Sequence, residues 1–332
     1  MPSAVPGVSP SPLTARARSS PGSGDERASG PLRGGYRGKD ERDERRGDEV
    51  SAHDRPFLEV ALGYTAGPAE VPRSRVRQAM TTHVHPATPP DYHVEVAQAL
   101  TAIGNPELGE AIRKDRGSEL EHLGIRFPEL RKRVKRGFSF YDLPEEQVLE
   151  VWDALWKSSP YGDVLFAALE YYAPIARKHV NPRLWPVIRH WSGRVDNWCH
   201  SDGLSGLYSR ALERYPDDVF PQIHVWNGAE GGWLRRISIV SLVHYSGKNA
   251  VFLPPDKVLP LVSNCLGDTR HHVQAAVGWV LREMGQVYPD EVGGYLETHA
   301  SAMSASAFSR AIERRSADDR ARLRGLRRSA LA

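Results

Sequence analysis

Residues 145–172 read EEQVLEVWDALWKSSPYGDVLFAALEYY, and this stretch decides the fold class. It opens with two acidic residues after Pro144, a composition typical of a helix start, where free N–H groups and the helix dipole favour negative charge. Apolar side chains then recur at spacings of one, three, four and seven between Val148 and Trp156. This period predicts one face of a helix, not a strand. The Ser-Ser-Pro sequence at 158–160 predicts a break before a second helix.

The same pattern recurs in GLSGLYSRALERY, GGWLRRISIVSLVHY and HHVQAAVGWVLREM, with short proline-containing breakers between these segments. Phe166 in FAALEYY and Arg236 in RISIVSL are 70 residues apart, or twice 35, and Ala275 in AAVGWVL follows after another 39. Periods of about 35 to 45 residues are typical of HEAT-type helix pairs. We therefore predict an all-α fold, an α-solenoid of HEAT-like antiparallel helix pairs with a curved, concave surface suited to a long partner. The alternative is an irregular helical domain with chance spacing.

The composition is typical of a globular protein, and the low net charge gives it no strong overall electrostatic field. The 332 residues are 40% hydrophobic and 26% charged, and 44 Lys and Arg against 41 Asp and Glu leave a net charge of +3. Any basic surface must therefore be local. Two cysteines cannot build a disulfide framework. No apolar run is long enough for a membrane span, and the N-terminus lacks a signal-peptide pattern, so we expect a cytoplasmic protein.

The N-terminal residues differ in composition from the rest of the chain. Pro, Ser, Gly and Ala dominate residues 1–30, and GKDERDERRGDE mixes both charge signs. Such a segment has too little apolar surface to order itself. We expect a disordered segment at 1–85, a repeat domain at 86–316 and a basic C-terminal tail at 317–332. Two interpretations of the N-terminus stay open: Met80 is the true start of the protein, or the residues before it form a genuine disordered tail.

Three predicted helices carry a tryptophan with a charged residue three or four positions later, so that both lie on one face. The pairs are Trp198 with Asp202, Trp233 with Arg236, and Trp279 with Arg282. Each pair by itself also fits a core tryptophan beside a helix-end residue. Three pairs on successive repeat units favour a common groove.

The chain resembles the DNA alkylation repair glycosylases built from HEAT-like repeats, the AlkD family. The resemblance runs from about Asp91 to Arg315 and is carried by LGIRFPELRKRVK at 123–135, the stretch at 145–172, VDNWCHSD at 195–202, WLRRISIVSL at 233–242 and VQAAVGWVLRE at 273–283. Two positions depart from the family pattern. Cys199 stands where an aspartate is often found, and Gly162 stands where an acidic residue is common, a change that we interpret as structural.

This resemblance implies a monomeric, cofactor-free DNA N-glycosylase that excises cationic N3- or N7-alkylated purines from double-stranded DNA without a base-specific pocket. It implies four catalytic positions. Asp202 would stabilise the positive charge that develops on the deoxyribose. Trp198 and Trp279 would hold the cationic nucleotide, and Arg236 would clamp a phosphate. We expect the protein in the cytoplasm, at the nucleoid when it binds DNA. Two alternatives stay open: a catalytically inactive HEAT-like scaffold that binds DNA or protein, and a self-resistance glycosylase for bulky alkyl adducts.

Local positive charge offers a way to grip the DNA backbone, because phosphate contacts dominate non-specific affinity. The predicted DNA-binding residues are Arg131, Lys132, Arg133, Lys135 and Arg136 of the RKRVKR run, together with Arg235 and Trp233. A solvated helix face is the alternative for this run, and the favoured interpretation of the arginine-rich C-terminal segment. The Cys199-His200 and His271-His272 pairs lack a frame of three or four ligands, so we predict no metal site.

Overall fold

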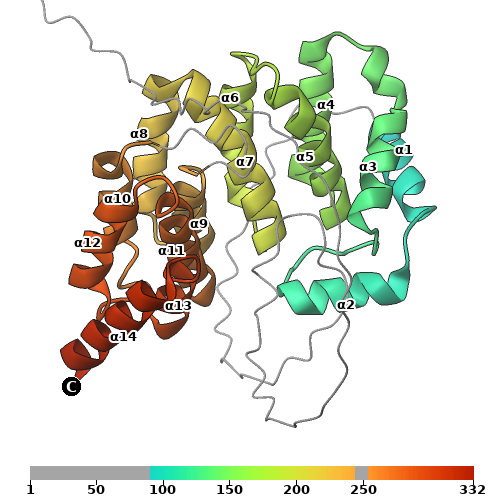
Figure 1. Cartoon of the computed structure of the whole chain (residues 1–332). Helices are drawn as coiled ribbons and strands as arrows, with labels where there is room; N and C mark the ends of the chain where they lie inside the picture. The colour runs from blue at the N-terminus through green and yellow to red at the C-terminus, as the bar shows by residue number, and fades with distance from the viewer. Residues whose placement is uncertain (1–89, 244–252) are drawn as a thin grey trace, which may run out of the picture. The chain divides into compact units, whose positions relative to one another are not determined.

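Helices and short loops form the chain wherever the structure, a computed structural model, describes it, at residues 90–243 and 253–332 (Figure 1). All of these residues lie within one unit, Ala69–Ala332. The helices are α1 (Pro90–Thr101), α2 (Pro106–Arg116), α3 (Phe127–Arg136), α4 (Glu145–Ser158), α5 (Gly162–Ala176), α6 (Leu184–Ile188), α7 (Trp198–Arg214), α8 (Pro216–Asn227), α9 (Gly232–Val240), α10 (Pro255–Ser263), α11 (His271–Met284), α12 (Pro289–His299), α13 (Ala305–Ala311) and α14 (Ala317–Leu331). The predicted disordered segment at 1–85 and the question of a start at Met80 lie outside the described residues.

The helices pack in two rows. In the first row, α3, α5, α7, α9, α11 and α13 each contact the next, as the run from green to red in Figure 1 shows. Helices α4, α8, α10 and α12 pack against this row, each on one or two of its members, and α6 packs on α4. Over the described residues the only strand-type pairing is an isolated bridge between Glu121 and Tyr161. The predicted all-α repeat of helix pairs is confirmed.

The repeat length agrees with the sequence period. Helices α5, α7, α9 and α11 begin at residues 162, 198, 232 and 271, so that the spacing is 36, 34 and 39 residues. Equivalent turns of neighbouring first-row helices therefore come from positions about one repeat apart. This register places residues that are far apart in sequence beside one another.

The predicted breakers end or begin helices. Helix α4 ends at Ser158, and α8, α10 and α12 each begin with a proline. A proline fits a first turn because its missing N–H has no partner there in any helix. Two first-row helices have side-chain caps instead. The side chains of Asn197 and Ser304 accept hydrogen bonds from the backbone N–H of His200 and Ala307.

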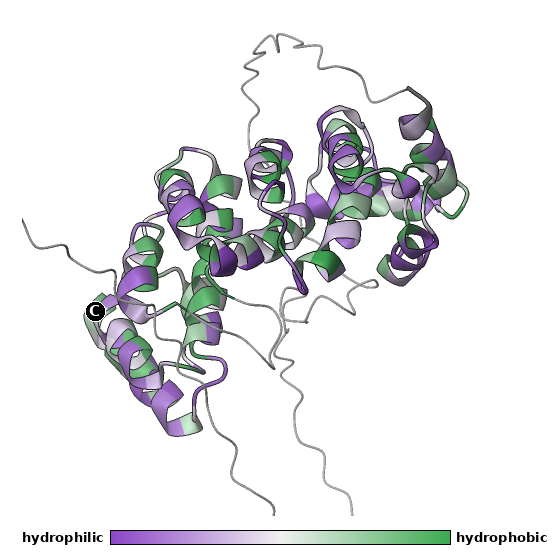
Figure 2. Ribbon diagram, turned by 90° about the horizontal axis from the view of Figure 1, so that it is seen from above, coloured by the Kyte–Doolittle hydropathy of each residue, from purple (hydrophilic) through white to green (hydrophobic). Residues whose placement is uncertain are grey.

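The core lies between the two rows, where the apolar stripes of the helices meet; in Figure 2 individual helices carry both hydrophobic green and hydrophilic purple residues. All six apolar residues of the predicted α4 stripe are buried. The first row packs closely at Gly278 of α11, where a Cβ atom would lie 2.5 Å from the carbonyl oxygen of Ala307 on α13. Any larger residue there would push the two helices apart.

The basic segment at residues 317–332 forms α14, which contacts α12 and buries Leu323. Its arginines mostly have partners: Arg322 pairs with Glu297 and Asp319, and Arg327 donates to the backbone carbonyl of Met303. Across residues 90–243 and 253–332, no helix combines the length and the apolar character that a membrane crossing requires.

Candidate active site

Three neighbouring first-row helices carry the four residues predicted as catalytic. Trp198 is the first residue of α7 and Asp202 lies about one turn later, while Arg236 lies on α9 and Trp279 on α11. Helix α9 packs against both α7 and α11. The structure therefore brings Asp202, Arg236 and Trp279 into one cluster, with Trp198 one helical turn away from the carboxylate.

Asp202 and Arg236 form a bidentate ion pair. Arg236 donates from Nε to Oδ1 of Asp202 and from Nη2 to Oδ2, both at 2.9 Å. Its Nη1 donates to the backbone carbonyl oxygen of His272 at 2.6 Å. Only 4% of Asp202 and 5% of Arg236 is exposed. In the structure this guanidinium fixes the position of the carboxylate. The phosphate contact expected of Arg236 stays a prediction.

The environment of Asp202 pulls its pKa in two directions. Burial raises the pKa of the Asp202 carboxyl above its usual value, because a charge is costly away from water. The positive charge and hydrogen bonds of Arg236, and the more distant charge of Arg310, lower it. The net direction is upward, so the ionised form of Asp202 depends on its arginine partner.

Trp198 and Trp279 are half-buried, so part of each ring is accessible to a ligand. The ring of Trp279 lies 6.0 Å from Cζ of Arg236, and the ring of Trp198 lies 6.0 Å from Cζ of Arg116. Each indole is thus beside a guanidinium, at the outer limit of a cation–π contact. Trp279 thus offers a ring beside the arginine that binds Asp202, and Trp198 offers a second ring one helical turn from Asp202 on α7.

Trp233 and Arg235, the predicted DNA contacts on α9, both have partners within the chain. The Trp233 ring stacks on His272 with centroids 4.0 Å apart. Burial and the neighbouring charges of Arg236 and Arg270 lower the pKa of His272 to about 4, so this ring is neutral at pH 7. Nε of Arg235 lies 2.9 Å from Oδ2 of Asp268. Their contact with DNA stays a prediction.

The three-residue spacing predicts that Arg282 shares a groove with Trp279, but in the structure Arg282 pairs with two glutamates. Its Nη1 lies 2.7 Å from Glu313, and its Nη2 lies 3.1 Å from Glu283. Only 6% of its side chain is exposed. Arg282 therefore ties α11 to the residues after α13, so that of the third predicted pair only Trp279 belongs to the cluster.

The RKRVKR run lies on α3, where its five basic residues divide into two kinds. Arg131 forms a bidentate pair with Glu170, at 2.8 and 2.9 Å. Arg133 donates to the carbonyl oxygen of Gly137, and its Cζ lies 4.2 Å from the Phe138 ring. The side chains that remain exposed are Lys132, Lys135 and Arg136. These three are the better candidates for phosphate contacts.

Cys199, where the resemblance to the AlkD family predicts an aspartate, is 1% exposed. Burial raises the pKa of its thiol to about 12, so the thiol stays protonated and is no nucleophile. Within the described parts of the chain, no group of three or more His, Cys, Asp or Glu side chains is placed to hold a metal ion.

A carboxylate that the sequence does not single out fixes the start of α7. Oδ2 of Asp196 accepts hydrogen bonds from the Ser118 hydroxyl at 2.8 Å and from the Glu119 backbone N–H at 2.7 Å, and Oδ1 accepts one from Asn197. Burial works to raise the pKa of Asp196, but interactions with His200, Ser118 and Asn197 hold it well below its usual range. Asp196 thus ties the loop after α2 to the helix that carries the candidate site.

We expect Asp196→Asn to lower the free energy of unfolding by about 1–3 kcal/mol at pH 7, because an amide leaves one of these donors without an acceptor. The depressed pKa adds a pH dependence. The contribution of Asp196 is present above the unfolded-state pKa of about 3.9 and is lost as pH falls towards the lower folded-state value. Urea denaturation between pH 3 and 7 measures both effects. The exposed Asp142→Asn is the control, and equal stability of the two variants would contradict the tether.

Gly162, the second departure from the family pattern, has a packing reason. A Cβ atom at this position would lie 2.5 Å from Cε1 of His122. The next residue supplies a buried carboxylate: Asp163 accepts hydrogen bonds from the backbone N–H of Leu123 at 2.7 Å and of Ile125 at 3.4 Å. A glycine at position 162 therefore makes room for the loop that Asp163 holds.

Comparison with known proteins points to one family. A family model described as "DNA alkylation repair enzyme" matches residues 96–314. No curated protein matches the chain. Among solved structures, a predicted DNA alkylation repair enzyme from Enterococcus faecalis shares 15% sequence identity. The match covers 64% of this chain and 97% of that one, with a TM-score of 0.52.

Two further structures match with lower TM-scores. AlkD2 from Streptococcus mutans shares 15% identity over 67% of this chain and 96% of its own, with a TM-score of 0.39. The alkylpurine DNA glycosylase AlkC from Pseudomonas fluorescens, bound to DNA containing an abasic site analogue, shares 14% identity over 67% of this chain and 62% of its own, with a TM-score of 0.41. The likeness to the Enterococcus protein shows the fold.

Proposed function

Because the chain belongs to the family of DNA alkylation repair enzymes, we propose that it is a DNA N-glycosylase that hydrolyses the glycosidic bond of cationic N3- or N7-alkylated purines in duplex DNA. The observation that carries this proposal is the carboxylate of Asp202, held by Arg236 in a cluster with Trp279 and one turn from Trp198. Asp202 is the catalytic residue, and the protein acts as a monomer without a cofactor.

Hydrolysis of such a lesion requires little from the enzyme beyond a negative charge held close to the deoxyribose. Alkylation at N3 or N7 makes the purine cationic, so that the base leaves without protonation by an acid. Positive charge then grows on the deoxyribose, as in other sugar hydrolyses through oxocarbenium-like states. A fixed carboxylate stabilises that charge in the transition state more than in the ground state and orients the attacking water.

The tryptophans and Arg236 support this carboxylate. Trp198 and Trp279 hold the cationic nucleotide through their ring faces, at about 0.5–2 kcal/mol each. Arg236 is a positioning residue: its Nε, Nη1 and Nη2 all donate within the chain, and its charge favours the ionised form of Asp202. Lys132, Lys135 and Arg136 contact the phosphates of the duplex.

One observation favours a second function. Asp202 is nearly buried and both of its oxygens accept from Arg236, an arrangement that also fits a structural ion pair in a DNA-binding scaffold without catalysis. The two functions differ in their product. A glycosylase releases a free base and leaves an abasic site, whereas a scaffold retains the intact duplex.

The experiment that separates them is base release under single-turnover conditions. The full chain, in excess over a duplex carrying N7-methylguanine, is expected to release free N7-methylguanine and leave alkali-labile abasic sites. A duplex with the neutral lesion O6-methylguanine is the control and should stay intact. A duplex with a bulky N7 adduct tests the role in self-resistance. Binding without release of the methylated base would establish the scaffold instead.

A further inference from the structure

Arg116 places a second guanidinium at the candidate site, on an element that the sequence did not connect with it. It is the last residue of α2, and Gly117 ends the helix with a φ of 60°. Its Cζ lies 5.8 Å from the Phe127 ring and 6.0 Å from the Trp198 ring. A cation is favourable at this end of a helix, where the dipole is negative.

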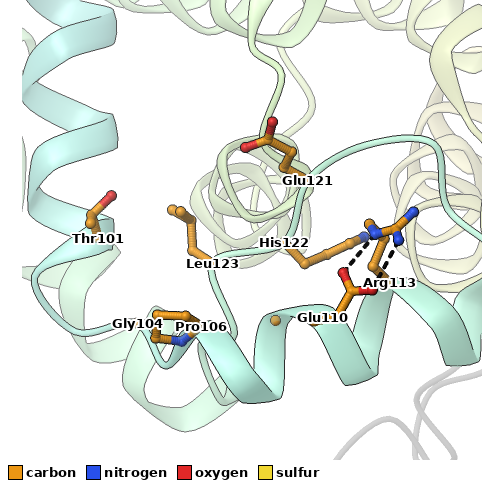
Figure 3. Close-up of a pocket in the computed structure, with 9 residues that line it drawn as sticks. Thr101, Gly104, Pro106, Glu110, Arg113, Glu121, His122 and Leu123 are labelled. Atoms are coloured by element: carbon orange, nitrogen blue, oxygen red, sulfur yellow. Dashed lines mark hydrogen bonds and ion pairs between the residues drawn. The ribbon is translucent and has the colours of Figure 1, made fainter.

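The neighbouring arginines are already committed to partners within the chain. Arg236 is fully engaged by Asp202 and His272, as described above, and Arg235 by Asp268. Figure 3 shows Arg113, one turn before Arg116 on α2, paired with Glu110 through two hydrogen bonds of 2.9 and 3.0 Å. By contrast, no carboxylate within residues 90–243 and 253–332 pairs with the half-buried Arg116.

A residue next to the candidate site, Asp196, holds Arg116 in position through the loop that follows α2. The loop that directly follows it, residues 118–120, donates three hydrogen bonds to Oδ2 of Asp196, from the Ser118 hydroxyl and from the backbone N–H groups of Glu119 and Leu120. Asp196 lies two residues before Trp198. The end of α2 and the start of α7 are therefore joined by one carboxylate, which holds Arg116 beside the Trp198 ring.

We propose that Arg116 binds a backbone phosphate of the duplex beside the nucleotide held at Trp198. This inference rests on the proposed function, because it assumes that DNA lies across α7. A guanidinium that lies over a ring keeps its N–H edge for an anion, and its planar fork matches a phosphate in two hydrogen bonds. Arg116 thus supplies a phosphate contact beside Trp198, while Arg236 holds Asp202.

The salt dependence of binding tests this contact. Each neutralised phosphate contributes about 0.9 to the slope of log K against log salt concentration. We expect Arg116→Gln in the full chain to lower that slope by about 0.9 on a methylated duplex. Arg116→Lys, which keeps the charge, retains the slope. The control is Arg183→Gln, which removes one charge from an exposed pair with Glu146 in the other row. Equal slopes for wild type, Arg116→Gln and Arg183→Gln would overturn the proposal, as would equal losses in Arg116→Gln and Arg116→Lys.

A scan with uncharged methylphosphonate linkages locates the phosphate. Neutralising one linkage next to the lesion is expected to weaken wild-type binding, and to have no further effect on Arg116→Gln. Equal weakening of both proteins at every linkage would show that Arg116 touches none of them. Failure of this inference is distinct from failure of the proposed function. Base release by the wild type tests the glycosylase, whereas the slopes and the scan test only where the backbone is held.

Discussion

We expect Asp202→Asn to release alkylpurine about 10²- to 10³-fold more slowly than the wild type, which is the size of effect seen when one fixed group that stabilises transition-state charge is removed. The asparagine side chain has the same shape and keeps one oxygen for Arg236, but it carries no negative charge to oppose the growing charge on the sugar. Single-turnover release of N7-methylguanine from duplex DNA measures the effect. Affinity for the same duplex should change little, since the proposed phosphate contacts involve other residues.

A matched control guards against a loss through misfolding. Asp115→Asn also removes a carboxylate near the start of α7, one that is exposed and contributes to the electrostatic environment of Cys199. It should release base at the wild-type rate. Thermal unfolding of both variants then shows whether the fold is intact. Undiminished release by Asp202→Asn would remove this carboxylate from the mechanism.

The helices could be predicted because each carries its own local signal. The apolar period of 148–156 and the prolines at 216, 255 and 289 act within one or two turns, and the structure has helices where they predict them. The repeat spacing can also be read from the sequence alone. It therefore predicted which helices are neighbours within the first row. Trp198 and Asp202 were placed together for the same reason, since they lie one turn apart on α7.

Pairings between helices were not predictable, because they depend on rotation and register that no local pattern encodes. Arg236 and Arg282 each follow a tryptophan by three residues, yet Arg236 meets Asp202 and Arg282 meets Glu313. Arg131 and Lys132 are adjacent cations, and only the packing of the helices shows that Arg131 is the one that pairs with Glu170. Arg116 lies more than 80 positions before Trp198, and nothing in the sequence links the two.

Arg236→Gln is expected to destabilise the protein by about 3–5 kcal/mol at pH 7, because it leaves the buried Asp202 charge without a partner. The pKa of Asp202, already raised by burial, rises further when the cation that opposes the shift is gone. A carboxyl group whose folded-state pKa lies above its unfolded value favours folding at low pH, and this contribution is lost as pH rises through the folded value. The variant should therefore regain stability as pH falls. Urea denaturation between pH 5 and 8 measures this, with Arg183→Gln as a control expected to cost about 0–1 kcal/mol.

The same substitution moves the pH dependence of base release. The proposed mechanism predicts that the wild-type rate falls on the acid side as Asp202 takes up a proton, at a pH above the ordinary aspartate value of about 3.9. In Arg236→Gln this acid limb shifts to higher pH, since the carboxylate protonates more readily. Asp202→Asn, which has no such group, supplies the spontaneous rate to subtract. An arginine that served only the packing of α9 would change the stability but not the pH profile, so an unshifted acid limb would contradict its role in keeping Asp202 ionised.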